Sequence, residues 1–546
     1  MGRNPYLSDM NGRKMLMVND KPFFIFGGEL HNSSASSLEY MKENVWDSLK
    51  PLNMNTVIAP VYWETIEPTE GEFDFSLPDG LIFQARENGM KLVLLWFGLW
   101  KNAQSTYPPK WIKKDYQKYF RVRNEYGEPL MNISPLCSQA VEADAGAFAK
   151  FMKHLREIDE EENTVIMVQI ENEIGILGSH NDFSVQAQAK FKAEIPDEVA
   201  AEFKINGTWE AAFAGEAAEN FMSYHYAKAV ETIAARGRAE YNLPMYVNAW
   251  LEQFPEIAGK YPCGGPIFKM AKMWKLAAPT IDFFAPDIYV DSYRDVCDEY
   301  ASNINLKSYV NQQGNVIPQV GVRNPRGDFN PLFIPEVRNT ADAASFIMYA
   351  MGKHNAIGFS PFAIEDLFAK SSAKTDAAVL TLLNIGEDAL SAGENAGKII
   401  GHTYKMLSNM CEVIWKAHRE SKINAFLEYN DSGILIFLEK YDLVITYSGH
   451  GSFFSPAPPK QVGEPLSAGF VIEDGDDIYL TGIGFSAVFL PKKGSKGKIE
   501  ILGKEEGSFE DNKWIRGRLL NGDEGYRITF GSIPETQKLN LHQINF

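Results

Sequence analysis

Residues 164–175 read TVIMVQIENEIG, an apolar run that ends in charged and amide side chains. The run follows a helix-like segment near 145–159, and its apolar residues are continuous rather than alternating. This pattern indicates a parallel strand that is buried on both faces. Seven similar runs occur in the first two thirds of the chain, at residues 23–30, 56–63, 91–100, 244–250, 282–290, 331–337 and 356–364.

Eight such strands, alternating with helices, predict an α/β fold and in particular a (β/α)8 TIM barrel. Apolar periodicity places two of the helices at 36–52 and 78–88. The rival fold, a doubly wound sheet, has fewer strands and a glycine-rich phosphate loop, and no GxGxxG follows the first run. Two long segments, 101–144 and 175–242, are expected as insertions on the side where a barrel holds its active site.

The composition changes after about residue 419. Short strand-like runs follow one another there, with Gly, Asp, Asn and Pro every eight to twelve residues. That rhythm is typical of a smaller antiparallel β-sandwich-like domain. We therefore expect a catalytic barrel over residues 1–418 and a β-rich domain over residues 419–546, with a helix at 402–418 closing the barrel.

Composition excludes several classes of function. The 53 Lys and Arg against 71 Asp and Glu give a net charge of −18, which disfavours nucleic acid and anionic membranes as partners. The four cysteines lie far apart, and no His or Cys cluster has metal-ligand spacing, so no metal is expected. No apolar run reaches membrane-spanning length. The first twenty residues lack the apolar core of a signal peptide, which predicts a cytoplasmic protein, or a periplasmic or secreted one whose signal peptide has been removed.

Carboxylates close two of the predicted strands. Glu171 and Glu173 end the fourth run, and Glu336 ends the seventh. Glu336 lies 163 residues after Glu173, yet the fourth and seventh strands of an eight-stranded barrel face each other across its mouth. If the fourth strand stays regular, Glu171 and Glu173 point to the same side. Two facing carboxylates are the equipment of a glycosidase, in which one is the acid and the other the nucleophile.

Aromatic and polar residues gather at the same strand ends. Aromatic faces can stack on sugar rings, although each aromatic residue could equally fill the core. The aromatic candidates are Tyr62, Trp63, Trp96, Phe97, Trp100, Trp250 and Tyr289. The polar candidates are His31, Glu64, Asn102, Asn248, Asp287 and Glu365. From these sets we expect substrate contacts from Trp63, Trp96, Asn102, Trp250, His31 and Glu365.

The sequence resembles glycoside hydrolase family 35, the beta-galactosidase family, in its bacterial branch. The segments that carry the resemblance are GGELHNSS at 27–34, YWETIEP at 62–68, QIENEIG at 169–175, IPE at 334–336 and GFSPF at 358–362. The match spans about residues 20–370, and the tail resembles the β-rich domain attached to many bacterial members. The sequence departs from the family at Ile174, where many members have Tyr, and at Glu29, where eukaryotic members have Ser.

The resemblance implies that Glu173 is the general acid/base and Glu336 the nucleophile, with Tyr289 beside the nucleophile and Asn172 on the 2-hydroxyl. It implies a retaining exo-acting beta-glycosidase, specifically a beta-galactosidase, that needs no cofactor and has a carbohydrate as its partner. Three alternatives stay open: the same mechanism on another beta-glycoside, transglycosylation in place of hydrolysis, and a carbohydrate-binding protein without catalysis. Assembly into a homo-oligomer also stays open.

Overall fold

A computed structural model describes residues 3–10, 13–301, 309–310, 316–317, 330–368, 393–429, 431–447, 463–525 and 527–545. By its internal contacts the chain divides into two compact units. Unit 1 holds residues 1–43 and 55–336, and unit 2 holds residues 44–54 and 337–546. This division places the break between residues 336 and 337, and the expected domain boundary at 418/419 stays a prediction.

The eight predicted runs all contain strands. In unit 1 they are β4 (Ile25–Glu29), β5 (Thr56–Tyr62), β6 (Lys91–Lys101), β9 (Val165–Asn172), β10 (Met245–Trp250), β11 (Phe283–Ile288), β14 (Phe333–Ile334) and, ending at the unit boundary, β15 (Glu336–Val337). The eighth run contains β16 (Gly358–Phe359), which belongs to unit 2. The seventh run is thus split in two by Pro335, which has no N–H for a ladder bond.

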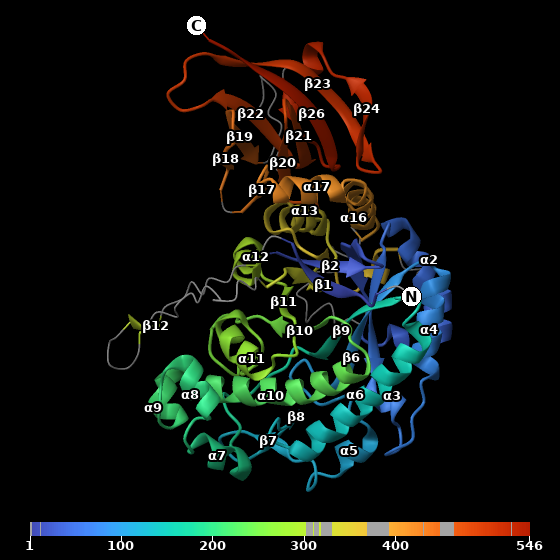
Figure 1. Ribbon diagram of the computed structural model, residues 1–546, viewed down its shortest axis with the longest axis vertical. Coiled ribbons are helices and arrows are strands. Elements are labelled where there is room, and N and C mark those ends of the chain that lie inside the picture. The colour runs from blue at the N-terminus through green and yellow to red at the C-terminus, as the bar shows by residue number, and fades with distance from the viewer. Residues whose placement is uncertain are drawn as a thin grey trace. The chain divides into compact units, whose positions relative to one another are not determined.

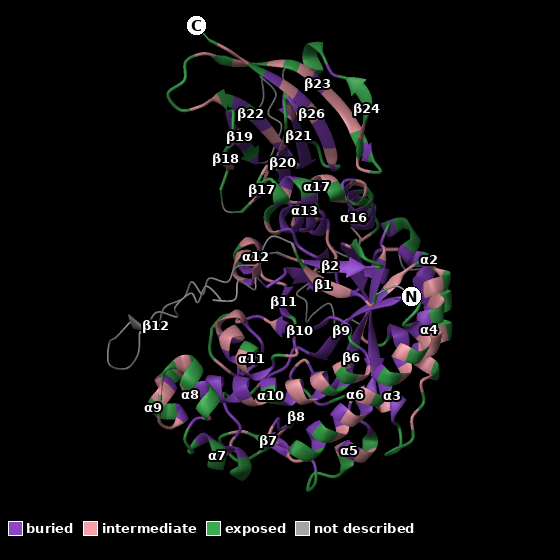
Figure 2. Cartoon of the chain, in the orientation of Figure 1, coloured by how far each residue is buried: buried purple, intermediate pink, exposed green. Residues whose placement is uncertain are grey.

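Unit 1 is a TIM-like barrel. Its strands lie in the order β4-β5-β6-β9-β10-β11, and each of these neighbouring pairs is parallel. The complete order of the sheet ends in β14 on one side and β15 on the other, and only Pro335 separates these two in sequence, so the sheet nearly closes. Every residue of β5, β9 and β11 is buried, as continuous apolar runs predict (Figure 2).

Helices cover the outside of this sheet. The main ones are α4 (Ser76–Glu87), α6 (Ser138–Asp159), α10 (Ala217–Glu240), α11 (Ala271–Ala277) and α12 (Tyr293–Ala301), and α6 and α10 lie side by side (Figure 1). The helix expected at 36–52 is present: after the 3-10 turn η1 (Ser34–Ser36), residues 38–52 are helical without a break, as α1 (Leu38–Tyr40), the π-helix η2 (Met41–Val45), α2 (Trp46–Leu49) and the 3-10 helix η3 (Lys50–Leu52). The last two fall in unit 2.

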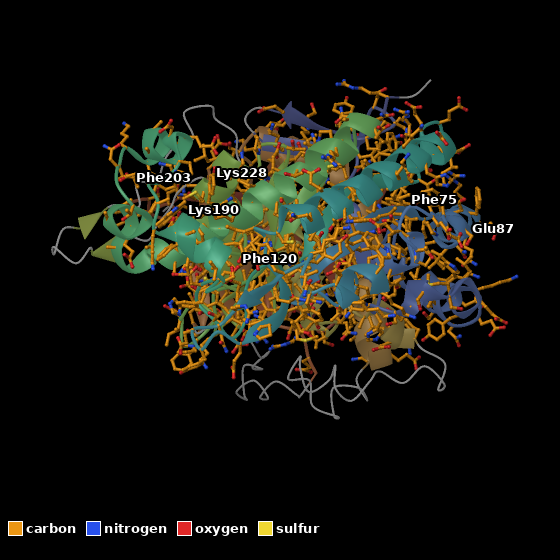
Figure 3. All side chains as sticks on the ribbon, turned by 90° about the horizontal axis from the view of Figure 1, so that it is seen from below. Phe75, Glu87, Phe120, Lys190, Phe203 and Lys228 are labelled. Carbon is orange, nitrogen blue, oxygen red and sulfur yellow. The ribbon has the colours of Figure 1, made fainter. Side chains whose placement is uncertain are left out.

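The two expected insertions are present in unit 1. The first contains α5 (Lys110–Lys114) and the hairpin β7 (Arg121–Arg123) with β8 (Pro129–Ile133). The second contains α7 (Val185–Phe191), α8 (Asp197–Phe203), α9 (Trp209–Phe213) and all of α10. Asp182 joins them, because its carboxylate accepts from the Arg123 N–H at 3.1 Å and from the Ser134 hydroxyl at 2.6 Å. Figure 3 shows Lys190, Phe203 and Lys228 of the second insertion on the side of the barrel away from Phe75 and Glu87.

Unit 2 contains two antiparallel sheets. One has the order β17 (Ile423–Leu427), β20 (Ala468–Asp474), β21 (Asp477–Ile483), β26 (Glu535–Ile544), β23 (Lys498–Glu510) and β24 (Lys513–Leu519). The other has the order β18 (Gly433–Phe437), β19 (Tyr441–Tyr447), β22 (Phe485–Pro491) and β25 (Ile528–Thr529). One core joins them, and in it the Phe426 and Phe485 rings meet edge to face at 4.8 Å. The predicted sandwich is confirmed.

Several elements differ from the sequence prediction. The strands β1 (Tyr6–Met10), β2 (Arg13–Val18) and β3 (Lys21–Pro22) form an unexpected N-terminal sheet. The helix expected at 402–418 is two helices, α16 (Gly393–Ser408) and α17 (Cys411–Arg419), which break at Asn409 and Met410. Strands β24 and β26 were not predicted, because charged and amide residues interrupt their apolar residues and leave no continuous apolar run. The loop expected at 452–459 lies outside the described residues.

The contact between α6 and α10 gives a test of the packing. Gly237 of α10 has no room for a side chain, because an added Cβ would lie 2.1 Å from Cε1 of the buried Phe148 ring. Gly146 of α6 has open space at the same position. Both changes to Ala gain about 1 kcal/mol of helix propensity, but overpacking costs about 1–3 kcal/mol. We expect Gly146→Ala to raise the melting temperature and Gly237→Ala to lower it relative to Gly146→Ala. Equal melting temperatures for the two variants would contradict this packing.

Candidate active site

The end of β9 does not continue as a regular strand. Glu171 and Glu173 both have left-handed backbone conformations, with φ of 60° and 45°. The side chains of Glu171 and Glu173 therefore do not share one environment, as strand alternation would have required. Glu171 accepts hydrogen bonds from the backbone N–H groups of Leu99 and Trp100, at 3.0 and 2.6 Å. Its carboxyl group is thus held by the backbone of β6.

Glu171 also pairs with another buried acid, Asp144 of α6. Asp144 accepts from the Trp96 indole N–H at 2.7 Å and from the Leu99 N–H at 2.9 Å. Burial, more than any other cause, raises the pKa of both carboxyl groups, and their mutual hydrogen bond raises that of Glu171 further. Two carboxyl groups in contact at a buried site hold a proton between them. Gly98 makes room for the pair, since a Cβ there would lie 2.4 Å from Asp144 Oδ2.

Backbone bonds then align the end of β6 with the site. The N–H groups of Asn102 and Ala103 donate to the carbonyl groups of Asn172 and Glu173, at 3.2 and 3.0 Å. Asn132 of β8 adds a brace, because its amide donates to the carbonyl groups of Ala103 and Gly175. These contacts fix the backbone on both sides of Glu173.

Glu173 lies in a buried acidic environment. Its N–H donates to Asn248 Oδ1 at 2.9 Å, and the amide of Asn248 donates to Asp287 Oδ2 at 2.7 Å. Burial, and next the charge of Glu336, raise the pKa of Glu173 to about 7, while Lys101 and a hydrogen bond from Asp287 oppose the rise. The pKa of Asp287 is itself raised well above its usual range, first by burial and then by Glu336. Glu173 can therefore hold a proton near neutral pH.

Glu336 has two hydrogen-bond donors. The hydroxyl of Tyr289 donates to Glu336 Oε2 at 2.9 Å. The amide of Asn172 lies 3.5 Å from Glu336 Oε1, and its oxygen accepts from Lys101 Nζ at 2.9 Å. The seventh strand and the end of the fourth are thus in contact, as the barrel predicts.

A further carboxyl group, that of Glu29, lies beside these residues. Glu29 ends β4 and is 1% exposed. Burial raises its pKa well above the usual range, with Glu336 the next cause and Lys101 opposing. Burial, followed by the nearby Glu336, favours a proton on Glu29, Glu173 and Asp287. Lys101 opposes this effect at Glu29 and Glu173.

The aromatic candidates differ in how far they are buried and in what they contact. Trp63 and Trp96 are fully buried, and each indole N–H is bonded to a carboxylate, that of Glu67 and Asp144 respectively. Trp96 also packs on Phe148 and Phe151 of α6, so it faces the helix layer. Tyr62, Phe97 and Trp100 are buried too, whereas Trp250 and Tyr289 are partly exposed. Large rings at these strand ends thus mainly fill the core.

The remaining candidates vary in position. His31 is partly exposed just after β4. Asn102 has a left-handed backbone, and its buried Oδ1 has no hydrogen-bond partner among the described residues. Glu365 is buried in η6 (Ile364–Phe368) of unit 2. Sequence reasoning assigned no role to Glu29 or Lys101, although each is a charged residue at the carboxyl end of an apolar run.

The described part of the chain has neither a candidate membrane span nor a candidate metal site. None of the helices found there has the length and hydropathy needed to span a bilayer. No group of three or more His, Cys, Asp or Glu among these residues is arranged to hold a metal ion.

Comparisons with known proteins give a family for part of the chain. Residues 15–249 match the model of Glycosyl hydrolases family 35, and residues 400–531 match a domain of unknown function, DUF5597. No curated protein matches the chain.

Three solved structures illustrate the similarity in fold. They are beta-galactosidases from Rahnella sp. R3 (15% identity, 70% of this chain and 57% of that one, TM-score 0.44), from Bacillus circulans sp. alkalophilus (9%, 94% and 99%, 0.45), and a GH42 enzyme from G. stearothermophilus (11%, 95% and 98%, 0.46). The chain thus spans little more than half of the Rahnella enzyme's length. TM-scores below 0.5 say nothing about this chain's substrate.

The Asp144–Glu171 pair can be tested by substitution. In Asp144→Asn, the new amide N–H can replace the shared proton and Oδ1 can still accept from Trp96. Asp144→Ala leaves the buried Trp96 N–H without an acceptor, which costs about 1–3 kcal/mol. We therefore expect urea unfolding to show a clearly lower free energy of unfolding for Asp144→Ala than for wild type, and a smaller decrease for Asp144→Asn.

Asp144→Asn also reports on the proton that Asp144 and Glu171 share. Because folding raises the pKa of both carboxyl groups, the folded chain holds protons that the unfolded chain releases above about pH 4. The stability that the pair contributes is therefore present below that pH and declines as pH rises. Relative to wild type, Asp144→Asn should gain stability between pH 4 and pH 8. Parallel stability curves would show that no proton is shared.

Proposed function

The chain is a glycoside hydrolase whose residues 15–249 belong to family 35, and from this premise we propose that it is a retaining, exo-acting beta-galactosidase. One observation carries the mechanism: Glu173 and Glu336 interact in one buried site and differ in their hydrogen-bond environment. Glu336 has donors that stabilise a carboxylate, while burial and that negative charge favour a proton on Glu173. A retaining glycosidase needs this unequal pair. The family supplies the choice of terminal galactose.

In the first step, a carboxylate oxygen of Glu336 attacks the anomeric carbon. The bond from that carbon to the leaving oxygen breaks, and the proton of Glu173 passes to the leaving oxygen. Tyr289 keeps Glu336 oriented through the 2.9 Å hydrogen bond. Asn172 contacts the 2-hydroxyl, and Lys101 holds the Asn172 side chain in place.

In the second step, Glu173 is ionised and Glu336 is esterified, so the charge that raised the pKa of Glu173 is gone. Glu173 accepts a proton from water as the water oxygen attacks the anomeric carbon, and the bond to Glu336 breaks. The sugar leaves with its beta configuration, and both carboxyl groups return to their starting states. A sugar hydroxyl in place of water would give transglycosylation.

A substrate panel with product analysis tests this function. We expect nitrophenyl beta-galactoside to be hydrolysed faster than the matching glucoside, fucoside and arabinoside. NMR of the earliest product should show the beta anomer, since a double displacement inverts the anomeric centre twice. An alpha anomer appearing first would refute the mechanism. Preference for another sugar would change only the substrate, and tight binding without turnover would support a carbohydrate-binding protein.

Azide should distinguish the two glutamates. Glu336→Ala lacks the nucleophile, so azide attacks directly and yields an alpha-glycosyl azide. Glu173→Ala still forms the glycosyl-enzyme from an aryl substrate, and azide then yields a beta-glycosyl azide. With a poor leaving group, Glu173→Ala should be about 10²–10⁴-fold slower than wild type. The same anomer from both variants would contradict these roles.

The pH profile gives an independent check of Glu173. Because the acid must be protonated in the first step and its pKa is about 7, wild-type kcat/KM should fall as pH rises through about 7. With an activated aryl substrate, Glu173→Ala should lose this alkaline limb. A limb that persists in the variant belongs to another group.

A further inference from the structure

The Glu29 carboxyl group is buried but has unmet hydrogen-bonding capacity. Its carboxyl group shares a hydrogen bond with that of Glu336, and apart from this contact its oxygens have no hydrogen-bond partner among the described residues. The groups that act on it electrostatically are Glu336 of β15, Lys101 of β6 and Glu173, which directly follows β9. Strands on different sides of the barrel thus surround it, which places it inside the barrel beside the reacting carboxylates.

Two further polar atoms near Glu336 are in the same state. The Tyr246 hydroxyl is buried and has no hydrogen-bond partner among the described residues, and the buried Asp287 Oδ1 has none there apart from the carboxyl group of Glu173. The charges of Glu336 and Glu29 act on both groups. Buried polar atoms without partners are costly, and such atoms gathered at one place indicate a missing polar ligand.

The chemistry of that ligand follows from the state of Glu29. A carboxyl group buried beside an ionised carboxylate keeps its proton, so it offers one O–H donor and one carbonyl acceptor. A sugar hydroxyl is also both a donor and an acceptor, and it carries no charge. It therefore matches Glu29 in hydrogen bonding without adding charge to a site that already holds Glu336 and Lys101.

We propose that Glu29 is a specificity-determining residue that binds one hydroxyl group of the glycone. This inference rests on the proposed function, because it places the sugar in the same site. Within the protein Glu29 contacts Glu336, and a sugar hydroxyl would give the remaining oxygen of Glu29 its hydrogen-bond partner. A sugar without that hydroxyl group leaves a buried polar group unpaired, which is the strongest form of discrimination against it.

The test combines Glu29 variants with deoxy substrates. The substrates are nitrophenyl beta-galactoside and its 2-, 3-, 4- and 6-deoxy analogues, and kcat/KM is measured for each. Glu29→Gln keeps a donor and an acceptor, so it should stay within about fivefold of wild type on the parent substrate. Glu29→Met keeps the length without the polar atoms and should lose about 10- to 100-fold.

One deoxy analogue should behave differently from the others. With the wild-type enzyme, kcat/KM for this analogue should fall below that for the parent substrate by about the factor that Glu29→Met causes. With Glu29→Met, kcat/KM for the analogue should be little lower than for the parent substrate, because the contact is already absent. Glu29→Ala serves if the Met variant does not fold, as judged by its melting temperature. Glu67→Gln is the matched control, a buried carboxylate that already accepts from Trp63 and Gly71, and it should affect all five substrates by one factor.

The outcomes separate the two levels of the proposal. If the Met and Ala losses are the same for every deoxy analogue, Glu29 binds water or supports the fold, and the inference is overturned. If wild type hydrolyses no glycoside in the panel, the proposed function fails and the inference fails with it. If another glycoside replaces galactoside, the deoxy series of that sugar decides the role of Glu29.

Discussion

The site depends on the electrostatic repulsion between several acidic side chains that are buried close together. Glu29, Asp287 and Glu336 lie on three strands and Glu173 directly follows a fourth, and the charge of Lys101 acts on Glu29 and Glu173. Water would let all of the acids ionise, but burial does not, so each proton's location depends on the charge of its neighbours. This coupling makes one acid a proton donor while another stays a carboxylate. A barrel makes this coupling possible because its strands surround one interior.

The precision of Glu173 comes from groups that do not touch a sugar. The Asp144–Glu171 pair ties α6, β6 and β9 together through Leu99, Trp100 and the Trp96 indole. Asn132 and the N–H groups of Asn102 and Ala103 then hold the segment around Glu173. Polar groups that satisfy one another in the interior act as a rigid frame. In this way the insertion that contains β8 contributes to the geometry of the site.

Much of this arrangement could be predicted from sequence, because parallel strands buried on both faces leave continuous apolar runs. The ends of those runs pointed to Glu173 and Glu336 directly. The direction of a ring at a strand end could not be predicted: Trp63 and Trp96 are covered by protein, while Trp250 is partly exposed. The different environments of Glu171 and Glu173 were also hidden, since alternation fails where the backbone turns left-handed. Glu29 also lies at the carboxyl end of an apolar run, as the other acids do, but its role can be inferred only from the residues that lie near it in the structure.

The left-handed backbone at Glu171 and Glu173 has a consequence for how this chain can be made more robust. Each such residue costs about 1–2 kcal/mol, and glycine would remove that cost. Yet glycine would also remove the two carboxyl groups on which the frame and the proton transfer rest. The barrel therefore carries a built-in instability at its centre that no local substitution can relieve without loss of activity. Engineering for heat resistance has to find its gains in the outer helices and in unit 2.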